Sequence, residues 1–228
     1  MPVLLARMID HTFLKAFGTP KDIERLCAEA GEFGFGAVIV NPAEIERCVE
    51  RLKGTPVAVG ATIGFPLGQN TAAAKEYEAR DAVARGAREL DMVINVRALQ
   101  SGEMEPLRAE LSALAGVCRE ARALSKVILE TCYLSDEEKR LACRMAKDAG
   151  VDFVKTSTGF GAGGATVADI RLMRAAVGPD MGVKASGGIR DLDTALAMIE
   201  AGATRIGTSG GVAMVEEARR RAKGEKRT

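Results

Sequence analysis

Two lysines lie inside segments that otherwise have the composition of buried strands. Lys155 occurs in FVKTSTGF (153–160), and Lys184 occurs in GVKASGGIR (182–190). A buried ammonium group must either pair with an anion or lose its proton, because an unpaired charge is costly to desolvate. A neutral lysine is a nucleophile toward carbonyl groups, and a second lysine nearby favours the neutral form by repulsion. The pair therefore predicts Schiff-base chemistry, in which one lysine attacks a carbonyl group and the other holds the positive charge.

Asp91, in ELDMVIN (89–95), is the carboxylate that strand alternation places with these lysines. Leu90 and Met92 share one face of this segment, and Asp91 lies on the other. We predict that Asp91 is a proton shuttle. The alternative is structural: each lysine pairs with a carboxylate such as Asp91 or Glu130, and the ion pair only rigidifies the core.

Three glycine-rich runs follow the last three predicted strands. They are STGFGAGGAT (157–166), SGGIR (186–190) and GTSGG (207–211). Each leads toward a predicted helix, so backbone N–H groups and helix N-termini can gather around an anion, and we expect a phosphate site there. The alternative is that the glycines only permit tight turns.

Residues 159–164 also match the pattern G-x-G-x-x-G, which allows an alternative function as a nicotinamide-dependent oxidoreductase. The match opens the sixth strand-helix unit instead of the first, and no acidic residue ends a following strand at the expected distance. A third possibility is a non-catalytic phosphosugar-binding barrel, in which Lys155 and Lys184 are structural or bind an anion.

His11 is the only histidine of the chain, which disfavours metal catalysis and serine-hydrolase chemistry. We therefore expect no metal and no cofactor. A structural hydrogen bond from His11 to Asp10 or Thr12 is favoured over a role as catalytic base. The five cysteines are odd in number and contain no C-x-x-C, which is typical of reduced thiols in the cytoplasm.

Short apolar or β-branched runs alternate with amphipathic segments along the whole chain. Strands are expected near 5–9, 36–40, 57–63, 89–95, 126–131, 151–156, 181–186 and 204–208. Helices are expected near 20–34, 42–52, 70–86, 103–122, 135–149, 166–177, 191–201 and 210–222. Eight strand-helix units predict an α/β protein with a (β/α)₈ barrel, and a doubly wound open sheet is the alternative. In a barrel, strand alternation turns Lys155, Lys184 and Asp91 inward.

Composition and charge support one barrel domain over residues 1–228. The chain is 47% hydrophobic and carries a formal net charge of +1, which indicates a small-molecule partner and disfavours nucleic acid and membrane surfaces. No uncharged apolar run reaches the length of a membrane span. We expect a cytoplasmic protein whose charged C-terminal tail starts at about residue 219.

Eight blocks of the sequence, in order, resemble those of the deoxyribose-phosphate aldolase family. They are MIDHTFLK, AVIVNP, TIGFPLG, ELDMVIN, KVILET, DFVKTSTGFG, VKASGGIR and RIGTSGG, and they cover about residues 8–212. The resemblance implies a metal-free class I aldolase that reversibly cleaves 2-deoxy-D-ribose 5-phosphate to D-glyceraldehyde 3-phosphate and acetaldehyde. It also implies a homodimer or homotetramer.

The same resemblance implies roles for individual residues. Lys155 would form the Schiff base, Lys184 would be the neighbouring cation that lowers its pKa, and Asp91 would be the proton relay. The phosphate would be held by Gly187, Gly188, Gly207 and Ser209. Some relatives carry lysine where this chain has Phe160, so the phosphate site here is expected to depend on backbone amides.

Overall fold

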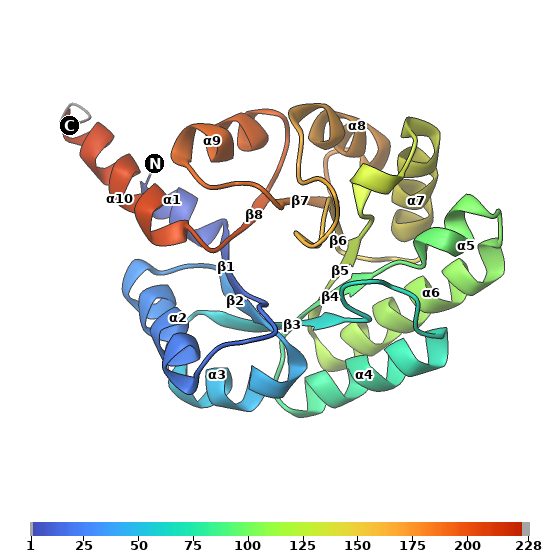
Figure 1. Ribbon diagram of the computed structural model, residues 1–228, viewed down its shortest axis with the longest axis horizontal. Helices are drawn as coiled ribbons and strands as arrows, with labels where there is room; N and C mark the ends of the chain where they lie inside the picture. Colours follow the sequence, from blue (N-terminus) through green and yellow to red (C-terminus); the bar gives the residue numbers. More distant parts are fainter. Residues whose placement is uncertain (1, 225–228) are drawn as a thin grey trace.

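The computed structural model describes residues 2–224, in which eight parallel strands close into a barrel (Figure 1). The strands are β1 (Ile9–Phe13), β2 (Ala37–Val40), β3 (Ala58–Ile63), β4 (Glu89–Val93), β5 (Leu124–Ile128), β6 (Phe153–Lys155), β7 (Gly182–Ser186) and β8 (Arg205–Thr208). β8 pairs with β1 through Ile9 and Ile206, which closes the sheet. The predicted (β/α)₈ barrel is confirmed, and the open-sheet alternative is wrong.

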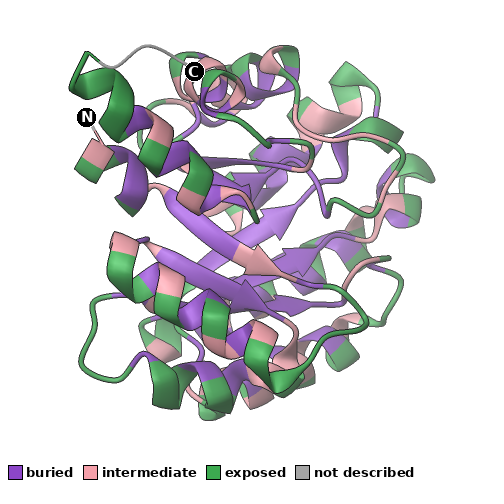
Figure 2. Ribbon diagram, turned by 60° about the vertical axis from the view of Figure 1, so that its left-hand side comes forward, coloured by how far each residue is buried: buried purple, intermediate pink, exposed green. Residues whose placement is uncertain are grey.

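Helices surround the barrel, with buried strands inside and exposed helix faces outside (Figure 2). The α-helices are α1 (Pro2–Arg7), α2 (Pro20–Phe33), α3 (Ile45–Arg51), α4 (Ala72–Ala84), α5 (Val96–Gln100), α6 (Met104–Ala121), α7 (Asp136–Asp148), α8 (Val167–Val177), α9 (Leu192–Glu200) and α10 (Gly211–Ala222). Two short 3-10 helices cover Pro42–Glu44 and Thr131–Tyr133. The sequence alone indicates most of these boundaries because caps mark them; Ser135 and Glu138, for example, form a capping box at the start of α7.

The predicted strand near 5–9 is wrong, because this segment is helix α1 and the first strand begins at Ile9. An apolar run as short as VLLA does not distinguish a helix from a strand. In the structure Leu5 is buried while Val3 and Leu4 are exposed, and α1 packs against α10. The strand predicted over 126–131 is also displaced, since Leu124 already pairs with Glu89.

The charged C-terminal segment begins inside a helix, because α10 continues through Ala222. Arg221 pairs with Asp193 and Glu217 on the surface. The part of the predicted tail at 225–228 lies outside the described residues. Among residues 2–224, no helix is long and apolar enough to cross a membrane.

Alternation along the strands separates two packed regions. Leu90 and Met92 face the helices and join the large apolar core between barrel and helices. Inside the barrel, Ala37, Ile39 and Leu14 form a smaller apolar cluster. The barrel interior also holds a cluster of charged side chains, and these make up the site.

Candidate active site

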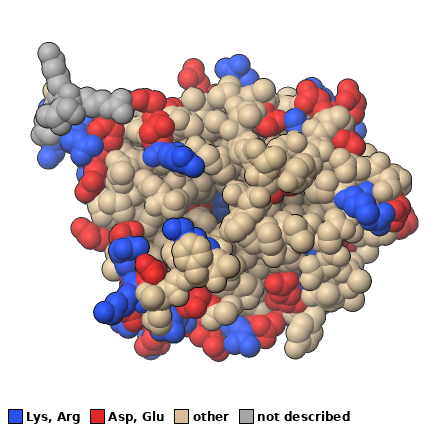
Figure 3. Space-filling view, viewed as in Figure 1, with Lys and Arg blue, Asp and Glu red and all other residues tan. Residues whose placement is uncertain are grey.

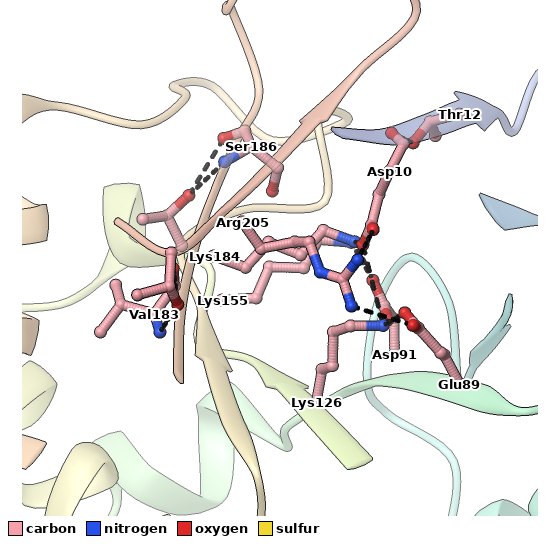
Figure 4. Close-up of polar contacts among 12 residues, drawn as sticks. Asp10, Thr12, Glu89, Asp91, Lys126, Lys155, Val183, Lys184, Ser186 and Arg205 are labelled. Atoms are coloured by element: carbon pink, nitrogen blue, oxygen red, sulfur yellow. Dashed lines mark hydrogen bonds and ion pairs between the residues drawn. The ribbon is translucent and has the colours of Figure 1, made fainter. Parts of the chain in front are cut away.

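The structure brings Lys155, Lys184 and Asp91 together inside the barrel (Figure 4). Lys155 on β6 and Lys184 on β7 are partners in the strand register, so their side chains leave the sheet side by side. The Asp91 Oδ2 atom accepts hydrogen bonds from the Nζ atoms of Lys155 and Lys184, each at 2.8 Å. All three side chains are buried, so water screens their charges little.

Four further charged residues that the sequence analysis did not assign complete this network (Figure 4). Lys126 on β5 lies 2.9 Å from the Oδ1 atom of Asp91 and also binds Glu89. Lys184 binds Asp10 on β1 as well. Arg205 on β8 joins Glu89 at 3.0 Å and lies 3.4 Å from Asp10. Strand alternation could have found them, since Glu89 is two residues from Asp91 on the same strand face.

The network of ion pairs inside the barrel holds one more cation than it holds carboxylates. Within residues 2–224, it consists of four cations and three carboxylates, namely Lys126, Lys155, Lys184, Arg205, Asp10, Glu89 and Asp91. A buried excess charge is unfavourable, so the least stabilised cation loses its proton first. Once that proton has left, the network is electrically balanced.

Lys155 is a cation of this network whose pKa is lowered. Burial lowers the pKa of Lys155 to about 8; Asp91 opposes this shift, whereas the charges of Lys184 and Lys126 add to it. By contrast, the carboxylates around Lys126 outweigh its burial and raise its pKa above the ordinary value. Among the residues that the structure describes, Lys155 forms an ion pair with Asp91 alone, whereas Lys184 binds both Asp91 and Asp10.

Asp91 remains ionised in this setting. Burial alone would raise the pKa of Asp91, but the charges of Lys126, Lys155 and Lys184 outweigh it and hold the pKa well below its usual range. When Lys155 becomes neutral, one of these three cations is lost, and Asp91 becomes a better proton acceptor. The two groups are therefore coupled, as expected for a pair that exchanges a proton.

Lys155 lies at a cavity of about 540 Å³ that opens at the carboxyl ends of the strands. In Figure 3 this face is hollowed near its centre, with Lys and Arg side chains beside the hollow. All four predicted phosphate residues line the cavity: Gly187, Gly188, Gly207 and Ser209. Ser209 lies two residues before the first residue of α10, where helix N–H groups attract anions. The structure thus brings the predicted lysine and the predicted phosphate residues to one cavity.

Three cations that the sequence analysis did not assign also line this cavity: Lys15, Arg25 and Arg190. Arg25 is engaged by Asp22 at 3.2 Å. Lys15 and Arg190 are exposed at the cavity and provide positive charge where the chain has Phe160 instead of a lysine. Arg190 directly follows the SGGI turn, a position that could have been noted from the sequence.

Gly207 has a second, steric function. A Cβ atom at this position would lie 3.1 Å from the Cε atom of Lys184 and 3.0 Å from the Cβ atom of Ser186. Such contacts are tighter than those that side chains normally make, so a larger residue would displace Lys184. The glycine is therefore needed both for the cavity and for the lysine.

The sequence profile of the DeoC/LacD family aldolases matches residues 4–216. The chain belongs to this family. The deoxyribose-phosphate aldolase of Bacteroides thetaiotaomicron is 63% identical over 212 residues, which cover 93% of this chain and 89% of that protein. The deoxyribose-phosphate aldolase of Thermococcus gammatolerans is 56% identical over 217 residues, 94% of this chain and 96% of that protein.

A solved structure of a deoxyribose phosphate aldolase also resembles this chain. The deoxyribose phosphate aldolase of Aeropyrum pernix, described as having a unique tetrameric structure, superposes with a TM-score of 0.89 at 34% identity. The match covers 96% of this chain and 92% of that one. The predicted family and the predicted aldolase activity class are confirmed.

His11 of this DeoC/LacD aldolase does not bind Asp10 or Thr12, so that expectation is wrong. The Nε2 atom of His11 lies 2.7 Å from the Oε2 atom of Glu29, and the ring packs on Phe35 with centroids 5.0 Å apart. Because β1 begins at Ile9, His11 lies in mid-strand and faces the helices, whereas Asp10 faces the barrel interior.

Two other expectations are corrected in the family's glycine-rich loop after β6. Glu130 binds Thr158 instead of a lysine, because it lies two residues beyond the end of β5, past the layer of the lysines. The G-x-G-x-x-G stretch at 159–164 does not open a helix, since α8 begins only at Val167. A dinucleotide fingerprint requires that its glycines lead directly into a helix N-terminus, which removes the geometric basis of the oxidoreductase alternative.

Proposed function

We propose that this chain is a class I deoxyribose-phosphate aldolase whose Schiff base forms on Lys155. It cleaves 2-deoxy-D-ribose 5-phosphate reversibly to D-glyceraldehyde 3-phosphate and acetaldehyde. The observation that carries the proposal is a buried lysine with a lowered pKa at the same cavity as the glycine turns and cations suited to phosphate. The names of relatives at 63% and 56% identity support the substrate.

The reaction follows from the chemistry of a neutral amine at this position. Lys155 adds to the C1 aldehyde of the open-chain sugar, and loss of water gives an iminium ion conjugated to C2. When the C3 hydroxyl gives up its proton, the C2–C3 bond breaks, and its electron pair moves into an enamine on Lys155. D-Glyceraldehyde 3-phosphate leaves, C2 takes up a proton, and hydrolysis releases acetaldehyde and the free lysine.

Lys184 and Asp91 have complementary roles in this proposal. Lys184 is held between Asp91 and Asp10, and its positive charge disfavours a second charge on Lys155. Asp91 contacts the amine that changes charge and relays the proton from the C3 hydroxyl, directly or through water. Asp91 thus lies within hydrogen-bond distance of the amine whose protonation changes.

The phosphate is proposed to lie between Gly187, Gly188, Gly207 and Ser209, with Lys15 and Arg190 at the rim of the cavity. Replacing Lys15 or Arg190 by alanine removes a charge-assisted contact to the phosphate. We expect KM for 2-deoxyribose 5-phosphate to rise roughly tenfold for each change, with little effect on unphosphorylated 2-deoxyribose.

Steady-state kinetics with both sugars would check the prediction on the phosphate site. Arg25→Ala is the control, because Arg25 lines the same cavity but is paired with Asp22. Equal losses for the phosphorylated and the unphosphorylated sugar would contradict the assignment of Lys15 and Arg190.

Borohydride trapping tests the proposed function. Reduction in the presence of acetaldehyde should attach a two-carbon unit to Lys155, which peptide mass mapping can distinguish from Lys126 and Lys184. Only a covalent imine gives this product, so the result separates an aldolase from a barrel that merely binds phosphosugars. A mass increase on another lysine, or no increase on active protein, would refute the mechanism.

The remaining expectations belong to the same proposal. Residues 1–228 are proposed to form one catalytic domain without metal or cofactor. A homodimer or homotetramer is supported by the tetrameric description of the Aeropyrum pernix relative and by the exposed apolar residues Val3, Leu4 and Phe17. A cytoplasmic location is supported by the five free cysteines.

A further inference from the structure

The loop from Thr158 to Gly161 separates two cavities at the mouth of the barrel. Thr158, Gly159 and Phe160 line the cavity that contains Lys155. On its other side, Thr158, Phe160 and Gly161 line a second cavity of about 420 Å³. This loop begins three residues after Lys155, so its position helps to define the wall against which the substrate is held.

Glu130 contacts this loop from the side of the second cavity. Its carboxylate is buried and accepts hydrogen bonds from the backbone N–H of Thr158, at 3.2 Å to Oε1 and 3.4 Å to Oε2, and from the Thr158 hydroxyl. The Thr158 hydroxyl oxygen in turn accepts the N–H of Phe160 at 3.0 Å. A chain of hydrogen bonds therefore runs from β5 into the loop.

The loop also packs directly on this carboxylate. A Cβ atom at Gly161 would lie 3.0 Å from the Cδ atom of Glu130. The carboxylate thus limits how closely the loop can approach Glu130, and it also orients the N–H groups of the loop.

The backbone of Glu130 is in an unfavourable conformation. Its φ of 54° and ψ of 62° lie in the left-handed region, which residues with a Cβ atom rarely adopt. Hydrogen bonds on both sides hold it there: Leu129 N–H to Lys155 O at 2.9 Å and Thr131 N–H to Thr156 O at 3.0 Å. Glycine would adopt this conformation without strain. A glutamate at this position therefore indicates that its side chain has a role that offsets the strain.

We propose that Glu130 is a positioning residue, whose carboxylate sets the loop Thr158–Gly161 against the Lys155 cavity. The inference rests on the proposed aldolase function, because the cavity is taken as the sugar-phosphate site. Misplacement of a substrate-positioning wall by about 1 Å can cost about 100-fold in rate. A loop without this anchor holds the phosphosugar less well but leaves the lysine chemistry in place.

Glu130→Gly is the decisive variant, since it removes the carboxylate and relieves the backbone strain at once. We expect kcat/KM for 2-deoxyribose 5-phosphate to fall about 10- to 100-fold. Glu130→Gln should recover part of this activity. An amide oxygen in the Oε2 position can accept both Thr158 donors, whereas the amide NH2 group replaces Oε1, which accepts the Thr158 N–H at 3.2 Å. Borohydride trapping of acetaldehyde on Lys155 should persist in both variants, and its absence from the unaltered protein would refute the proposed function instead.

Arg122→Gly is the matched control. Arg122 has a φ of 53° at the exposed end of α6, so the change relieves the same kind of strain far from the cavities. It should leave kcat/KM unchanged. If Glu130→Gly does not fold, Thr158→Val tests the same anchor from the loop side. It removes the hydroxyl hydrogen bond to Glu130 and the acceptor of the Phe160 N–H but keeps the backbone N–H of residue 158, so kcat/KM should fall by a smaller factor. Unchanged kcat/KM in the folded Glu130→Gly or Thr158→Val protein, or a glutamine variant as impaired as the glycine variant, would overturn the proposal.

Discussion

Lys155→Met is expected to reduce aldol cleavage by about 10⁴-fold or more, the order of loss found when a covalent nucleophile is removed. Methionine fills nearly the same space but cannot form an imine. Borohydride and acetaldehyde should then add no mass to the peptide that contains position 155. A coupled assay of acetaldehyde release from 2-deoxyribose 5-phosphate would measure the loss.

The same variant should fold at least as well as the unaltered chain at pH 7. The pKa of Lys155 lies at about 8 in the folded protein and near 10.5 in an unfolded chain. A lysine whose pKa is lowered by folding makes an unfavourable contribution to the free energy of folding. This contribution is fully present below pH 8 and disappears as the pH rises above 10.5. Methionine removes the cost and leaves three cations opposite three carboxylates in the barrel. Residual activity within tenfold of the original would contradict the assignment of Lys155.

Lys184→Met is expected to shift the pH dependence of kcat/KM upward. In the unaltered protein kcat/KM should rise with pH through a midpoint near 8, because only neutral Lys155 attacks the aldehyde. Without the positive charge of Lys184, Lys155 holds its proton more tightly, and the midpoint moves to higher pH. Each unit of this shift lowers activity at pH 7 about tenfold.

Lys184→Met should also destabilise the protein, unlike the change at Lys155. Lys184 lies between Asp10 and Asp91, both fully buried, and its loss leaves carboxylate charge without its partner. Removing one member of a buried pair typically costs about 3 to 5 kcal/mol. Urea denaturation would measure this loss of stability, and initial rates across pH would give the profile.

Lys75→Met separates the two effects of the change at Lys184. Lys75 is as buried as Lys184 and pairs with Glu110, but it lies outside the barrel interior, between α4 and α6. Its replacement should destabilise the protein without moving the pH profile. A profile of Lys184→Met that matches that of Lys75→Met would refute the coupling between the two barrel lysines.

The fold could be predicted largely from the sequence because its signals are local. Alternation of strand and helix segments, helix caps such as Ser135, and glycines after helix ends set the order of the elements. The first strand could not be placed, since the short apolar run at 3–6 suits a helix or a strand, and only packing against α10 decides between them.

The site was determined by the sequence only in part. Strand alternation already turned Lys155, Lys184 and Asp91 inward, because the side-chain period of a strand is two regardless of fold. Alternation also turns Lys126, Asp10, Glu89 and Arg205 inward, but it does not show how they pair. Asp10 on β1 and Arg205 on β8 come together with Lys184 and Glu89 only in the closed barrel, in which β1 pairs with β8. The charge balance depends on all seven charged residues that the structure describes in the network inside the barrel. Tertiary structure therefore decides which lysine loses its proton.

Glu130 shows the same limit at the mouth of the barrel. As a carboxylate, Glu130 was expected to pair with a lysine. In the structure its backbone is left-handed, and its side chain binds Thr158 instead. Side-chain direction at the end of a strand depends on local backbone conformation and on the loop that packs there, and neither follows from alternation. The sequence by itself indicated the strand-helix order and the inward pair of lysines, while the tertiary structure closed the barrel and decided which charges surround each lysine and what holds the loop beside Lys155.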